Sequence, residues 1–211
     1  MYHVTIEKYI DNHMKDLNFP IRFKFNVTTL SNDFSAIDAS GKMVAYVRQK
    51  MFKLKEDINI YDTENKSNLT HNIRADQWID FSAAYSFKDA QGKEIGKIAR
   101  QGWASIWKAH YELIDQHQKL QYHIREDSAW VKVLDSIFGQ LPIIGGLTGY
   151  LFNPSYTVTD LNDQAICQLK KEPSFFGRKF TLSKLKPINK DDDERIILGF
   201  MMMVLLERRR G

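Results

Sequence analysis

The sequence contains a single cysteine, Cys167, among 211 residues, and this excludes an internal disulfide framework. A chain of this kind suits a reducing compartment. Residues 1–16 carry charges throughout and lack the apolar core that a signal peptide requires. We therefore expect a cytoplasmic protein, which could also take a peripheral position at a membrane.

The sequence also lacks an apolar run long enough to cross a bilayer. Residues 196–206 are apolar on every side, but a helix of this length spans only about 16 Å, half of a hydrocarbon core. Acidic residues precede this segment and Arg208, Arg209 and Arg210 follow it, as the helix dipole favours. A helix that is apolar all round must be enclosed by protein. The side chains that we expect to be buried are Ile197, Phe200, Met201, Val204 and Leu205.

A strong charge bias and the usual catalytic motifs are missing as well. The net charge is only +4, so nucleic-acid binding is not indicated. No Gly-x-Ser-x-Gly, Walker loop or His-Glu-x-x-His motif is found, and we predict no catalytic residue, cofactor or metal. His110, His117 and Asp115 lie near one expected turn, but their spacing matches no familiar zinc site, which favours ordinary strand or surface histidines.

What the sequence does contain is a repeat of five segments that each end at an aspartate. An aromatic residue or Ile stands four residues before the Asp and an apolar residue two before it, which is the alternation of a half-buried strand. Asp begins tight turns well, and Gly41, Asn65, Gly92 and Asp163 follow as expected left-handed residues. The copy at Asp115 lacks such a residue. The segments are 34–38, 58–62, 85–89, 111–115 and 156–160.

Further strand-like stretches follow the turns, at 43–48, 94–99, 121–125 and 165–170. A long series of strands and turns predicts an antiparallel sheet that closes into a barrel, because closure removes its edges. Residues 21–27 alternate as one more strand. We therefore predict a mainly β protein in which the C-terminal helix fills the barrel.

Two segments stand outside this pattern, at the N-terminus and within the repeat. Residues 1–19 are expected to hold an amphipathic helix that ends before Pro20. The remaining residues, 20–211, are expected to form a single barrel domain. An apolar insertion at about 126–153 interrupts the repeat, with no charged residue between Asp135 and Asp160.

The repeated unit that closes on an apolar helix resembles the tubby C-terminal-like superfamily. Residues 47–62 look like its LURP-one-related branch, and residues 176–207 are similar to the C-terminal end of phospholipid scramblases. The resemblance covers roughly residues 20–210. It implies a closed antiparallel β-barrel of about twelve strands around a central hydrophobic C-terminal α-helix.

The resemblance to scramblases stops at their acidic calcium-binding segment. The corresponding stretch here, residues 170–186, is basic, whereas calcium requires oxygen ligands. No calcium is therefore expected as a partner.

Two sets of residues are candidates for contact with a partner. The basic set concentrates in the last quarter of the chain and suits anionic phospholipid head groups: Lys170, Lys171, Arg178, Lys179, Arg208, Arg209 and Arg210. The apolar set surrounds the insertion and suits a membrane or a protein partner: Trp130, Ile137, Phe138, Tyr150 and Phe152.

These candidates leave two functions open, while a third, an enzyme that acts in a cavity, would require polar groups inside the barrel that residues 196–206 do not provide. The first is a non-catalytic binding module that meets anionic phospholipid or a membrane surface. The second is a soluble protein-interaction or scaffold barrel, in which the apolar insertion is buried or forms a homo-oligomer contact.

Overall fold

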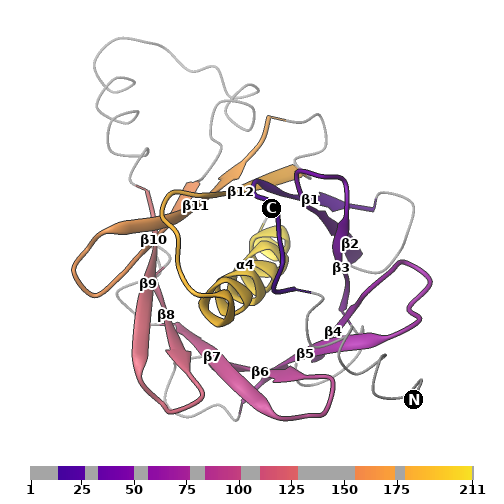
Figure 1. Ribbon diagram of the computed structural model, residues 1–211, viewed down its shortest axis with the longest axis horizontal. Coiled ribbons are helices and arrows are strands. Elements are labelled where there is room, and N and C mark those ends of the chain that lie inside the picture. Colours follow the sequence, from indigo (N-terminus) through magenta and orange to yellow (C-terminus); the bar gives the residue numbers. More distant parts are fainter. Residues whose placement is uncertain are drawn as a thin grey trace.

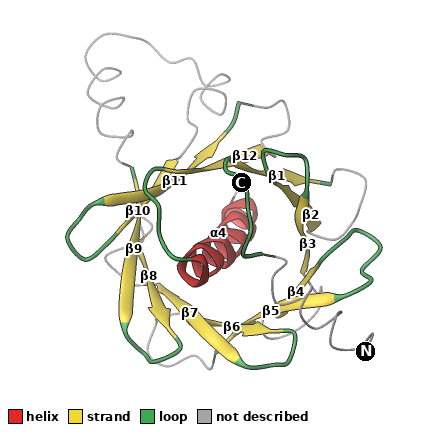
Figure 2. Cartoon of the chain, viewed as in Figure 1, coloured by secondary structure: helices red, strands yellow, loops and turns green. Residues whose placement is uncertain are grey.

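A computed structural model of the chain confirms the mainly β class, and Figure 2 shows a ring of strands around one helix. The structure describes residues 14–26, 33–49, 57–76, 84–100, 110–127, 155–173 and 179–210. Side chains of the helix are described through Leu205. The apolar insertion and residues 1–13 lie outside these ranges, so the N-terminal helix stays a prediction, and residues 14–16 form a turn.

Twelve strands and one helix make up the described fold. The strands are β1 (Ile21–Phe25), β2 (Asp33–Ile37), β3 (Met43–Gln49), β4 (Asp57–Tyr61), β5 (Leu69–Ala75), β6 (Ala84–Asp89), β7 (Glu94–Arg100), β8 (His110–Asp115), β9 (Leu120–Glu126), β10 (Ser155–Thr159), β11 (Ala165–Lys171) and β12 (Lys179–Lys184). The helix is α4 (Lys190–Arg210).

Each strand pairs antiparallel with its neighbour in the sequence, and β1 pairs with both β2 and β12 to close the barrel. Figure 1 shows this order around the ring, with α4 inside. Closure leaves no unpaired strand edge among the described residues. The alternation of apolar residues in the sequence does not predict β5 or β12, although both strands are needed to complete the ring.

The repeated aspartates occupy the turns of one end of the barrel. In the four turns that begin at Asp38, Asp89, Asp115 and Asp160, the Asp carboxylate accepts hydrogen bonds from the backbone N–H groups two and four residues later. Burial raises the pKa of Asp115, but hydrogen bonds from Lys119, His117 and Gln121 lower it by more, and the net pKa is lowered. The aspartates therefore act as turn residues, as predicted.

The left-handed positions differ from the expectation at two turns. Gly41, Gly92 and Asp163 have positive φ as expected, but in the second turn the residue is Lys66 (φ 56°) and not Asn65. That turn is longer, because the Asp62 carboxylate accepts the backbone N–H of Asn68. In the fourth turn the left-handed residue is Gln118 (φ 62°). Glutamine has no intrinsic preference for this conformation, and hydrogen bonds to Asp115 hold the turn in place.

The helix α4 fills the barrel, and the five side chains predicted to be buried are all at most 1% exposed. It begins at Lys190, six residues before the apolar segment. Inward-facing strand residues such as Phe23, Phe87 and Ile124 belong to the same core. Each fully buried side chain of this size stabilises the fold by about 1.5–3 kcal/mol, so the wall and the helix depend on each other.

The helix packs tightly against the wall at Gly199. A Cβ atom there would lie 3.0 Å from Leu113 Cδ2 and 3.5 Å from Ile98 Cδ1. We expect Gly199→Leu to lower the free energy of unfolding by about 1–3 kcal/mol, because its side chain has no space. Urea denaturation measures the change.

Gly199→Ala is the matched control. One methyl group needs only a small movement of the Leu113 side chain, and alanine favours a helix over glycine by about 1 kcal/mol. A Gly199→Leu protein as stable as the alanine variant would mean that α4 does not pack against β7 and β8.

Candidate functional site

A basic surface covers the place where the barrel closes. In β1, apolar side chains alternate with Arg22 and Lys24, which are exposed on the outside. The pairing places Lys24 opposite Lys179 and Arg22 opposite Thr181, while Thr181 is also opposite Lys170. Residues directly opposite one another share a face of the sheet. Arg22, Lys24, Lys170 and Lys179 therefore form one outer surface, which we call the seam surface.

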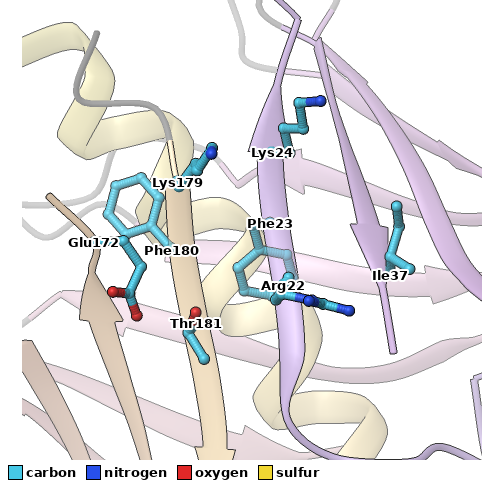
Figure 3. Close-up of a pocket in the computed structure, with 8 residues that line it drawn as sticks. All are labelled: Arg22, Phe23, Lys24, Ile37, Glu172, Lys179, Phe180 and Thr181. Atoms are coloured by element: carbon cyan, nitrogen blue, oxygen red, sulfur yellow. The ribbon is translucent and has the colours of Figure 1, made fainter. Parts of the chain in front are cut away.

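A cavity of about 280 Å³ lies in this surface, and Figure 3 shows its lining. Arg22 and Lys24 extend from β1, and Lys179 extends from β12. The residues that line the cavity are Arg22, Phe23, Lys24, Ile37, Glu172, Lys179, Phe180 and Thr181. Cationic groups beside aromatic and aliphatic carbon suit an anionic group attached to an apolar body.

The cations of the seam surface are not neutralised by partners. Within the described ranges, Arg22, Lys24, Lys170 and Lys179 form no ion pair and no side-chain hydrogen bond. Other basic side chains do pair, as Arg125 does with Asp163 at 3.2 Å. Glu172 is the acidic residue of the cavity. The surface therefore carries a positive potential that attracts anions.

The predicted basic residues are only partly brought together. Lys170 and Lys179 lie on the seam surface, whereas Lys171 is half-buried and opposite Phe180, in the inward-facing row. Arg178 lies outside the described residues. The side chains of Arg208, Arg209 and Arg210 also lie outside them, although these residues belong to α4.

The apolar candidates Trp130, Ile137, Phe138, Tyr150 and Phe152 likewise lie outside the described residues. Sequence reasoning missed Arg22 and Lys24. A signal was present, because residues 21–27 were assigned to a strand and their alternation points both cations outward.

A second cluster of charged groups surrounds the beginning of α4 and is buried. Tyr122 donates a hydrogen bond to Asp192 (2.7 Å), Lys184 pairs with Asp193 (2.6 Å), and His71 contacts Glu194 (3.0 Å). These partners come from β9, β12 and β5, so the first turn of the helix is held from three sides of the barrel. The paired charges satisfy the rule that ionised groups are buried only with partners.

This buried cluster does not have the properties of a catalytic centre. Burial raises the pKa of the Cys167 thiol to about 12, and Asp193 contributes. The thiol is therefore protonated at neutral pH and is not a nucleophile, in agreement with its interpretation from the sequence. Burial likewise raises the pKa of Asp193, although Lys184 lowers it in part. The cluster anchors the helix.

The described ranges lack two classes of feature. They hold no group of three or more His, Cys, Asp or Glu residues placed to bind a metal ion. They also hold no helix that combines the length and the apolar content that a membrane crossing requires.

Comparison with known proteins gives one result. A family model described as LURP-one-related matches residues 43–201, which is well over half of the chain. The match begins at the first residue of β3 and ends within α4. No curated protein and no solved structure matches the chain.

The pair of Lys184 and Asp193 permits a test of the anchor. Lys184→Met leaves the Asp193 carboxylate buried without its partner, and we expect a loss of about 3 kcal/mol at pH 7. The double variant Lys184→Met/Asp193→Leu removes both charges and should recover most of this loss. Urea denaturation measures both.

The loss should depend on pH in a defined direction. The pKa of Asp193 is raised in the folded state, so ionisation of this group costs stability as the pH rises through that value. Without Lys184 the pKa rises further, and the loss should shrink as the pH falls from 7 towards 5. A loss of equal size at both pH values would contradict the burial of an unpaired Asp193.

Proposed function

This chain belongs to the LURP-one-related family, and from that premise we propose that it is a non-catalytic binding module that meets anionic phospholipid at a membrane surface. The observation that carries the proposal is the seam surface, which has four cations without partners in the described ranges, three of which (Arg22, Lys24 and Lys179) line a cavity that also has apolar lining.

The electrostatics of the seam surface support this proposal. A Lys or Arg near an anionic membrane contributes about 1 kcal/mol of attraction, and the effect falls off within a Debye length. Four such residues give weak, salt-sensitive binding. The apolar lining of the cavity can contact the glycerol and acyl region behind a phosphate group, which adds a contribution that salt does not screen.

The filled interior supports a binding role over catalysis. The central helix is apolar from Ile196 to Leu205, and all of these residues are buried, including Gly199, which packs against the wall. The described polar groups inside the barrel are paired with one another at the start of the helix. Partners are then expected to bind at the outer surface.

Vesicle co-sedimentation tests the proposal. The protein should sediment with vesicles that contain phosphatidylserine at low salt, and should remain in the supernatant with pure phosphatidylcholine. The variant Arg22→Gln/Lys24→Gln/Lys179→Gln should lose this binding. Raising the salt concentration to 0.5 M should weaken binding of the unchanged protein.

A control with the same loss of charge separates a site from general attraction. Arg74→Gln/Lys88→Gln/Lys93→Gln removes three cations from β5, β6 and the turn after β6, which lie across the ring from β1 and β12 (Figure 1). This variant should bind as the unchanged protein does. Equal losses in both variants would show that net charge alone is responsible.

The absence of any binding to anionic vesicles at low salt would reject the phospholipid proposal. The other function left open by the sequence, a protein-interaction or scaffold barrel, would then be the one to pursue through partners of the seam surface.

A further inference from the structure

A pair of histidines lies on the outer wall of the barrel, away from the seam surface. His110 is the first residue of β8, and His123 lies in the neighbouring strand β9. The atoms His110 Nε2 and His123 Nδ1 are 3.5 Å apart, and the two rings meet edge to face. Their inward neighbours Tyr111 and Ile124 belong to the core, so the strands that carry the pair are firmly placed.

The distance between these nitrogen atoms is informative. Hydrogen bonds from nitrogen usually have lengths near 2.9–3.0 Å, so 3.5 Å is long for a direct bond. Two histidine ligands of one tetrahedral zinc ion, each at about 2.0–2.1 Å, have nitrogen atoms about 3.3–3.4 Å apart. The observed separation is closer to the second arrangement.

The surroundings of His110 lower its pKa. Burial lowers the pKa of His110, and the charges of Arg125 and His123 lower it further, while Glu112 raises it. A neutral imidazole has the lone pair that a metal ion requires. Glu112 lies opposite His123 in the pairing and adds negative charge, and the nearby Arg125 is engaged by Asp163 at 3.2 Å.

A third observation concerns Thr159, which lies opposite His123 on the other neighbouring strand, β10. Its hydroxyl is buried and forms no hydrogen bond with the described part of the protein. A metal-bound histidine donates its second N–H to an oxygen atom, and this orients the ring. The free hydroxyl beside His123 suits that role.

We propose that His110 and His123 form a zinc-binding site on the outer wall of β8 and β9. The two rings supply two ligands, and water molecules complete the coordination. When zinc binds, the unpaired Thr159 hydroxyl supplies an acceptor for the second N–H of His123. The site is independent of the phospholipid proposal, because it lies on other strands and uses none of the seam residues.

Calorimetric titration of the full chain with zinc chloride at pH 7.5 tests this site. The unchanged protein should bind one zinc ion that either His110→Ala or His123→Ala weakens by about tenfold or more. Bound zinc should also raise the melting temperature of the unchanged protein, since a ligand of the folded state stabilises it. Binding should weaken at acidic pH, because a protonated imidazole has no lone pair for a metal ion.

His117→Ala is the matched control, since His117 is exposed on the turn that joins the same two strands. This variant should bind zinc as the unchanged protein does. His110→Gln and His123→Gln provide replacements of similar size, should an alanine variant fold poorly. No zinc binding by the unchanged protein, or binding that survives both histidine substitutions, would overturn the proposal and leave a hydrogen-bonded histidine pair.

Discussion

The enclosure of α4 by the strands is the interaction on which the rest of the structure depends. A helix that is apolar on every side is stable in water only when protein surrounds it, and a ring of twelve strands encloses a space that must be filled. Phe200, Met201 and Val204 fill that space and are at most 1% exposed. Neither part has a core without the other.

The charged first turn of α4 fixes the position of the enclosed helix within the barrel. Asp192, Asp193 and Glu194 suit the positive end of the helix, and each has a partner from a different strand. An apolar first turn would face the turns of the barrel without fixing the rotation of the helix. The paired charges fix it, because only one rotation brings all three to their partners.

A filled barrel also directs binding to the outside. The seam surface arises because β1 pairs with β12, and the zinc proposal arises because β8 pairs with β9 in one register. Both depend on side chains that point away from the core, at positions where the fold tolerates almost any polar residue. For this reason the family and the barrel predict little about the ligand.

Much of the fold was predictable from the sequence, and much of the candidate site was not. The alternation before each aspartate and the apolar segment 196–206 are local patterns, and they indicated the barrel and its central helix correctly. The pairing of strands distant in sequence is not local. His117 is close to His110 in the chain, whereas the histidine next to His110 in space is His123.

For the same reason, the sequence alone does not predict the seam surface. Lys24 and Lys179 are brought together only by the closure of the ring, which no local pattern specifies. Gln118 shows a different limit, because its left-handed conformation is imposed by hydrogen bonds to Asp115 and not by its own preference.

The reactivity of Cys167 tests the enclosure of α4 most directly. This thiol is 0% exposed in β11, and Asp193, at the start of the helix, contributes to its raised pKa. The measurement compares the rate of thiol labelling in the full chain with that in a chain that lacks residues 195–211. The account predicts no labelling of the folded full chain, and rapid labelling of a truncated chain that shows no cooperative unfolding. A truncated chain that melts cooperatively and protects Cys167 as well as the full chain does would contradict it.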